Sequence, residues 1–148
     1  MSAGRGAAPR LAQEEEAELL CEGLEGLSGR EPLLVARFYE LFFERHPEVR
    51  GLFGVHGLSE QEEMVRETLV SVVAYIEREP WLEINLEAMG KSHSEYGVEA
   101  PMYDWFVECM LDALKQVSGT GWRVDYDPAW RSALGLLTDI MRAAGARA

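Results

Sequence analysis

Three histidines are the side chains of this sequence best suited to hold a metal or to move a proton near neutral pH: His46, His56 and His93. His46 stands among charged residues and His56 lies in a glycine-rich segment, so both are expected at the surface. His93 follows Leu86 and Met89 by seven and four residues, which places all three on one face of a helix. A lone histidine on an apolar face is more often a core residue than a ligand, yet only His93 has a setting that could present it to a cavity.

The sequence lacks the motifs with which side chains alone hold a metal or attack a substrate. It has no His-Glu-x-x-His or Cys-x-x-Cys spacing, no glycine-rich phosphate loop after a strand and no Gly-x-Ser-x-Gly elbow. The two cysteines, Cys21 and Cys109, are expected to be buried apolar fillers. A cofactor that brings its own metal ligands and needs one histidine from the protein remains possible.

The composition of the chain limits the classes of protein to which it could belong. The chain has 148 residues with 14 Lys or Arg and 26 Asp or Glu, a formal net charge of −12, and it is 47% hydrophobic and 27% charged. These values fit one globular domain, and the negative charge argues against sequence-independent binding to nucleic acid or to an anionic membrane. The sequence shows neither a membrane span nor a secretory signal, and two cysteines fit a reducing compartment. We therefore expect a cytoplasmic protein, with a disordered tail over residues 1–11 and a domain over residues 12–148.

The hydrophobic pattern is helical from the tail onward. It predicts six substantial helices and one short element over residues 48–53, with no convincing strand. Capping boxes at residues 28–31 and 59–62 predict two helix starts. The second box opens the clearest amphipathic helix, whose inward face is predicted to carry Val65, Leu69 and Val72. Because the helices differ in length and show no sustained heptad, the fold class is all-α with oblique helix crossings.

Two segments of the sequence resemble a known family. Residues 38–42 (FYELF) followed by residues 46–53 (HPEVRGLF) resemble the second helix and the following corner of globins. Residues 89–98 (MGKSHSEYGV) resemble the globin segment that carries the haem-binding histidine. The likeness is greatest to bacterial single-domain and flavohemoglobin-type globins and extends over about residues 14–144. It implies a single-domain globin fold, a three-over-three helical sandwich, with haem b as the cofactor.

The resemblance also implies roles for individual positions. It makes His93 the proximal iron ligand with Tyr103 beside it, and it places Phe53 against the haem face. On the distal side it implies hydrogen-bond donors at Tyr39 and Gln61. Further cofactor contacts are implied for Val65, Leu69, Met89, Val98 and Phe106.

One position departs from the family pattern. Where flavohemoglobin-type globins carry a glutamate behind the proximal histidine, this chain has Gly145. A carboxylate there would push electron density toward the iron and favour cleavage of the O–O bond. Its absence favours gas binding over enzyme activity.

The function implied by the resemblance is reversible binding of dioxygen, and also of carbon monoxide and nitric oxide, at ferrous haem iron, as in oxygen transport. Two alternatives stay open: a nitric oxide dioxygenase that relies on a separate reductase, and a haem-based gas sensor. The sequence determines neither the physiological gas nor the electron donor nor the oligomeric state. Iron ligation by Gln61 or His56 in the absence of gas also stays open.

Overall fold

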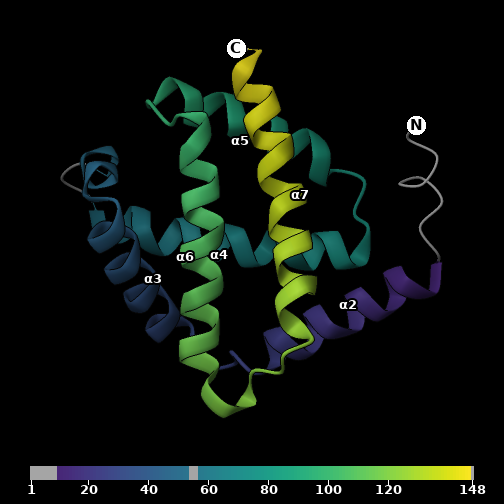
Figure 1. Cartoon of the computed structure of the whole chain (residues 1–148). Helices are drawn as coiled ribbons and strands as arrows, with labels where there is room; N and C mark the ends of the chain where they lie inside the picture. Colours follow the sequence, from purple (N-terminus) through teal and green to yellow (C-terminus); the bar gives the residue numbers. More distant parts are fainter. Residues whose placement is uncertain (1–9, 54–56, 148) are drawn as a thin grey trace.

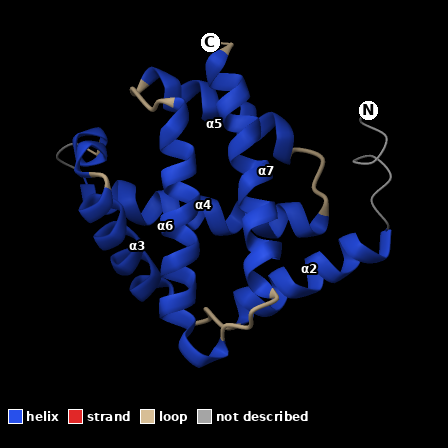
Figure 2. Cartoon of the chain, viewed as in Figure 1, coloured by secondary structure: helices blue, strands red, loops and turns tan. Residues whose placement is uncertain are grey.

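The structure is a computed structural model that describes residues 10–53 and 57–147. Over these residues the backbone is helical without any strand, which confirms the predicted all-α class (Figure 2). The elements in order are α2 (Arg10–Glu25), α3 (Glu31–Arg45), η1 (Pro47–Leu52), α4 (Gly57–Glu77), α5 (Leu82–Glu95), α6 (Ala100–Ser118), η3 (Gly119–Gly121) and α7 (Tyr126–Ala146), where η marks a 3-10 helix. Most of the predicted tail, residues 1–9, lies outside the described part of the chain, and α2 begins at Arg10.

The helices cross one another obliquely in two layers. Figure 1 shows α6 and α7 running side by side, with α4 and α5 crossing behind them. The main helix contacts join α5 to α7, α3 to α6, α6 to α7 and α2 to α7. Helix α7 therefore touches elements of both layers, and it is the helix against which α5 is positioned.

The core is centred where α3, α6 and α7 meet. Phe38 of α3 is fully buried, and its ring packs on those of Phe42 and Phe106 at centroid distances of 5.0 and 5.4 Å. Trp130 of α7 is also fully buried. A Cβ at Gly23 would lie 3.1 Å from Trp130 Cε2, so only a glycine lets α2 pass this close to the indole. Aromatic packing of this kind fixes the helix crossings that form the site.

The predicted capping boxes are not the helix starts of the structure. Helix α3 begins at Glu31 with Arg30 as its N-cap and without a side-chain cap, because Ser28 belongs to the turn that closes α2. Gly29 completes that turn with a φ of +78°. Helix α4 begins at Gly57, so Ser59 of the second predicted box lies inside the helix.

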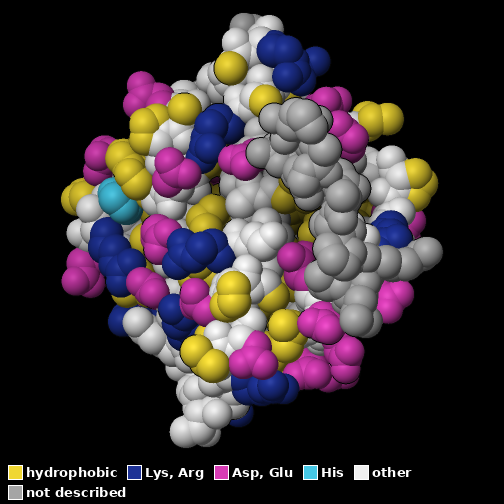
Figure 3. All heavy atoms as spheres, turned by 45° about the vertical axis from the view of Figure 1, so that its right-hand side comes forward, with side chains coloured by type: hydrophobic (Ala, Val, Ile, Leu, Met, Phe, Trp, Pro, Cys, Tyr) yellow, Lys and Arg dark blue, Asp and Glu magenta, His cyan; other side chains and the backbone are white. Residues whose placement is uncertain are grey.

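The surface is acidic and mixed in character. On the face shown in Figure 3, Lys and Arg side chains lie in separate groups among those of Asp and Glu. Across the described residues, no helix is long and apolar enough to cross a membrane. Cys109 is buried as expected, whereas Cys21 is exposed, which corrects the expectation that both are buried fillers.

Candidate functional site

A cavity of about 410 Å³ is lined by α4, α5, α6, α7 and the segment that follows α3. Its walls are mostly apolar, and pockets of this size and character suit small-molecule and cofactor binding. Of the residues predicted to contact a cofactor, the cavity brings together Phe53, Met89, His93, Val98, Tyr103 and Phe106. Further apolar lining comes from Phe42, Val49, Leu52, Leu86, Met102, Leu134, Leu137 and Met141.

His93 lies in the last turn of α5, half-buried at the cavity wall. Its Nδ1 is 2.7 Å from the backbone carbonyl oxygen of Met89, one turn earlier in the same helix. Because a carbonyl can only accept a hydrogen bond, the neutral ring must carry its proton on Nδ1 and donate it. The lone pair of Nε2 is then free to bind a metal, which is the arrangement that a histidine ligand needs.

Tyr103 of α6 lies beside the histidine, as the sequence predicts. The two rings are stacked with their centroids 6.5 Å apart, and the Arg142 guanidinium lies 5.7 Å from the centre of the tyrosine ring. Burial raises the pKa of Tyr103, and the charge of Arg142 partly offsets that rise. The phenol therefore stays protonated and neutral next to His93.

Behind His93, α5 and α7 are in backbone contact at Gly90. An added Cβ at Gly90 would lie 2.7 Å from Met141 Cα, which leaves no room for a side chain. At Gly145 an added Cβ would meet the Gly90 carbonyl oxygen at 3.2 Å and Ser94 Cβ at 3.3 Å. The position where related globins carry a glutamate thus lies against the back of α5. The described part of the chain shows a carbonyl, and no carboxylate, as hydrogen-bond partner of His93.

Helix α4 presents a different face to the cavity from the predicted one. Its lining residues are Ser59, Glu60, Glu63, Met64, Glu67, Thr68 and Ser71. Gln61, Val65 and Leu69, which the sequence places at this face, do not line the cavity. Met64 and Thr68 line the cavity, and each precedes a predicted residue, Val65 or Leu69, by one position. Because each residue turns an α-helix by about 100°, this shift of one position points the side chains in a clearly different direction.

The predicted residues of α4 pack against protein instead. Val65 is only 1% exposed, and together with Leu69 it lines a groove that also contains Pro32 and Val35 of α3. The amide nitrogen of Gln61 lies beside Gly57, 3.6 Å from the place where a Cβ on that glycine would be. The strongest apolar stripe of α4 is thus used to hold α4 on the protein core.

Tyr39, a predicted distal donor, does not line the cavity and lies behind two residues that do, Phe53 and Met64. Tyr39 is 4% exposed, its ring stands edge-on to Phe53 at 5.2 Å, and its hydroxyl lies 3.6 Å from Met64 Sδ. Burial, and to a lesser extent the charge of Glu60, raises the pKa of Tyr39, so the hydroxyl remains a donor. The Thr68 hydroxyl donates to the Met64 carbonyl oxygen at 2.8 Å, so its proton is already committed.

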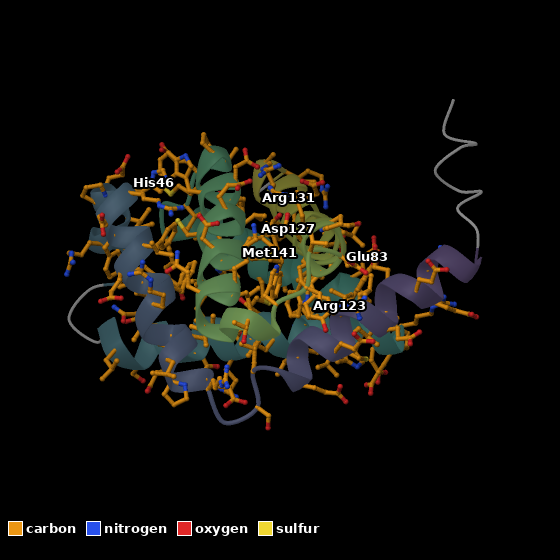
Figure 4. The ribbon with its side chains drawn as sticks, turned by 60° about the horizontal axis from the view of Figure 1, so that its bottom comes forward. His46, Glu83, Arg123, Asp127, Arg131 and Met141 are labelled. Atoms are coloured by element: carbon orange, nitrogen blue, oxygen red, sulfur yellow. The ribbon has the colours of Figure 1, made fainter. Side chains whose placement is uncertain are left out.

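The other histidines are outside this cavity. His46 is half-buried and stacks on Trp105, with ring centroids 4.2 Å apart and planes 4° from parallel. Figure 4 shows it at the edge of the molecule, away from Met141. His56 lies outside the described residues. His93 is therefore the histidine that the described structure places at the cavity.

Sequence reasoning missed Met64, Thr68 and the contribution of α7. Met64, Thr68 and Ser71 follow one another at spacings of four and three, which is a helical signal. The stripe at Val65, Leu69 and Val72 is more apolar and predicts the inward face of the helix, and the resemblance to globins assigns Val65 and Leu69 to the cofactor. The lining from α7 includes Leu134, Leu137, Thr138 and Met141.

Comparison with known proteins gives a consistent result. The family model for Globin matches residues 36–141. A globin-like protein of Aquifex aeolicus is 30% identical over 109 residues, which are 73% of this chain and 76% of that protein. A flavohemoprotein of Rhizobium meliloti is 27% identical over 110 residues, again 73% of this chain. These residues make up only 27% of the flavohemoprotein, so the chain matches about a quarter of that protein's length.

Solved structures show the same fold. An engineered carbene transferase from Rhodothermus marinus, described as a putative nitric oxide dioxygenase, aligns with a TM-score of 0.72 and 27% identity over 89% of this chain and 92% of that one. A bacterial globin from Campylobacter jejuni aligns with a TM-score of 0.73 and 18% identity over 90% of this chain and 96% of that one. Together with the all-helical architecture, these alignments confirm the predicted single-domain globin fold.

Proposed function

Because the chain belongs to the globin family, we propose that it binds haem b, with His93 as the proximal iron ligand, and that it binds dioxygen reversibly. The observation that carries this proposal is the bond from His93 Nδ1 to the Met89 carbonyl oxygen at 2.7 Å. That bond fixes the tautomer in which Nε2 can bind iron. Haem supplies a ferrous iron able to bind dioxygen, carbon monoxide or nitric oxide.

The residues around the cavity fit the group. Phe53, Met89, Val98 and Phe106 give the apolar contacts that a mostly apolar macrocycle needs, and all four line the cavity. The remaining sequence assignments on α4, at Gln61, Val65 and Leu69, are not carried into the proposal, because these side chains do not line the cavity.

The proximal hydrogen bond favours gas binding over O–O bond cleavage. A carboxylate partner would make the imidazole of His93 a stronger electron donor, whereas a neutral carbonyl does so only weakly. The partner here is the Met89 carbonyl, and Gly145 offers no carboxylate. This chain's proximal side therefore supports reversible binding.

On the distal side, Tyr39 is the donor that can stabilise a bound gas: it does not line the cavity itself, but its hydroxyl lies 3.6 Å from the Sδ of Met64, which does. Its hydroxyl keeps its proton because burial raises its pKa, and its present partner is the Met64 thioether. A thioether is a weak acceptor, so the hydroxyl can be released to a more polar ligand. Dioxygen gains more from such a donor than the less polar carbon monoxide.

The test of the proposal is the absorption spectrum of the protein loaded with haem, recorded oxidised, reduced, and reduced with carbon monoxide. We expect a Soret band that shifts with carbon monoxide. In His93→Gly we expect loss of the proximal bond and its recovery when imidazole is added. His46→Gly is the matched control, because His46 lies outside the cavity. Failure of the wild-type protein to take up haem, or haem spectra identical in His93→Gly and wild type, would overturn the proposal.

A second candidate function is nitric oxide dioxygenase activity with a separate reductase. It is favoured by the similarity to flavohemoproteins and to the Rhodothermus marinus protein described as a putative nitric oxide dioxygenase. The measurement is the yield of nitrate from nitric oxide and dioxygen when the reduced protein is supplied with a flavin reductase. Repeated turnover would establish the enzyme, whereas a single equivalent of nitrate would leave the protein a gas binder. Cytoplasmic location stays a prediction.

A further inference from the structure

We propose that the thioether sulfur of Met64, which reaches the cavity from α4, would be the second protein ligand of the haem iron in the resting protein, and that a gas would have to displace it. The inference rests on the proposed haem binding and goes beyond it, because it assigns the ligand on the gas-binding side. Nothing in the resemblance to globins pointed to this residue. It follows from the face that α4 turns to the cavity.

The position of Met64 separates it from two of the other methionines at the cavity, Met89 and Met141. Four methionines line this space: Met64, Met89, Met102 and Met141. Met89 lies one turn before His93 in the same helix, so it shares the proximal wall with that histidine. The Met141 backbone abuts Gly90, also behind α5. Met64 comes from α4, a different wall, in the middle of the residues that α4 contributes.

The chemistry of the α4 wall favours the sulfur over its neighbours. The other polar groups that α4 contributes to the cavity are carboxylates and hydroxyls, and the Thr68 hydroxyl is engaged with the Met64 carbonyl oxygen. A thioether is neutral and soft, so it can bind iron without losing a proton and without adding charge to an apolar space. The combination of histidine and methionine is an established pair of haem ligands in electron-transfer proteins, where it raises the reduction potential.

Tyr39 keeps the sulfur in place. Its buried hydroxyl lies 3.6 Å from Met64 Sδ, within hydrogen-bonding distance for sulfur. The thioether has two lone pairs, so one can accept from Tyr39 while the other binds iron. Methionine has three rotatable side-chain bonds, which lets the sulfur move away when another ligand arrives.

Displacement of Met64 then links the two distal residues. When the sulfur leaves the iron, the Tyr39 hydroxyl loses its partner and becomes free to donate to the incoming gas. The apparent gas affinity is reduced by the fraction of protein in which the sulfur is bound. If sulfur occupies the iron in nine molecules of ten, removing it should raise the apparent affinity roughly tenfold.

The experiment compares haem-loaded wild type, Met64→Leu and Met89→Leu. Leucine conserves the apolar volume, and Met89 is the matched control because it lines the same cavity from the proximal helix. We expect low-spin iron in the wild type, with the weak far-red charge-transfer band of a sulfur ligand in the ferric state. Met64→Leu should lose that band and become high-spin, with carbon monoxide binding roughly tenfold tighter. Met89→Leu should behave as wild type.

The outcomes separate the role of Met64 as a ligand from the proposed haem binding on which it rests. High-spin iron in the wild type, or a sulfur band that survives in Met64→Leu, would overturn the role of Met64 and leave haem binding intact. Complete failure to take up haem would overturn both. If Met64→Leu does not fold, which circular dichroism of the apoprotein would reveal, high-spin iron in the wild type would still overturn the role of Met64, and so would loss of the sulfur band in Met89→Leu.

Discussion

The substitution Gly90→Ala tests whether the contact between α5 and α7 determines the position of the proximal histidine. A Cβ at Gly90 would lie 2.7 Å from Met141 Cα and 2.8 Å from its carbonyl carbon, and closer still to the carbonyl oxygen. Ordinary contact begins at 3.4 Å, so relieving the contact with Met141 Cα alone needs a separation of about 0.7 Å, and relieving the contact with the carbonyl oxygen needs more. The neighbouring atoms belong to backbone, which cannot rotate out of the way.

Two opposing effects set the magnitude. Replacing glycine by alanine inside a helix stabilises it by about 1 kcal/mol. Overpacking costs about 1–3 kcal/mol, and a clash with backbone belongs at the upper end. We therefore expect Gly90→Ala to lower the free energy of unfolding by about 2 kcal/mol. Because α5 also carries His93, the variant should lose haem faster than wild type.

The assay is urea unfolding of the apoprotein, with haem transfer to an acceptor protein as a second readout. Gly135→Ala is the matched control. Gly135 lies in α7, the helix that Gly90 contacts, and a Cβ added at Gly135 would have no neighbour within 4 Å. That control should be more stable than wild type by about 0.5–1 kcal/mol. Equal stability of the two alanine variants would refute the claim that the crossing at Gly90 admits no side chain.

Three further predictions concern Tyr39 and Val65, two buried residues that the sequence assigned to the site. Tyr39→Phe should speed dioxygen release about tenfold, because a hydrogen bond of about 1–1.5 kcal/mol is lost, with little change in carbon monoxide release. Tyr75→Phe is the control, because the Tyr75 hydroxyl donates to Glu16 away from the cavity. In laser-flash and stopped-flow kinetics, Tyr75→Phe should change the release of neither gas. Val65→Ala should lower the free energy of unfolding by about 2 kcal/mol yet leave the spectrum with carbon monoxide unchanged, and a changed spectrum would restore Val65 to the cavity face. Burial raises the pKa of Tyr39 above its ordinary 10.0, so above pH 10.0 the unfolded chain loses a proton that the folded protein keeps. The free energy of unfolding should therefore fall by about 1.4 kcal/mol per pH unit in this range. Urea unfolding should show that this part of the alkaline slope is absent in Tyr39→Phe, and its persistence in that variant would contradict the reasoning.

The proximal half of the site was predictable because its chemistry lies in one continuous segment. Met89, His93, Gly97 and Val98 follow one another within ten residues, and helical spacing together with a glycine stop fixes their relative positions. The structure keeps that order: α5 ends at Glu95, and Gly97 has a φ of +101°. Tyr103 follows because α6 begins directly after this corner.

The distal half was not predictable to the residue. Helix α4 has two stripes with helical spacing, one through Val65 and Leu69 and one through Met64 and Thr68. Hydrophobicity favours the first stripe for burial; Val65 is indeed buried and Leu69 half-buried, but both lie on the side of α4 that faces α3. Sequence periodicity cannot tell burial against protein from burial against a cavity. An assignment of α4 residues by their resemblance to globin positions must be correct to the residue, because a shift of one residue in the match turns the helix by about 100°.

The dependence of α5 on α7 has a consequence for the order of events during synthesis. His93 leaves the ribosome well before α7, the helix that supports α5 and contributes Leu134, Leu137 and Met141 to the cavity. A nascent chain that ends before α7 has its histidine but no enclosed space around it. If the chain binds haem as proposed, we expect uptake to follow translation of α7, and truncated translation products to compete poorly with the finished protein for haem.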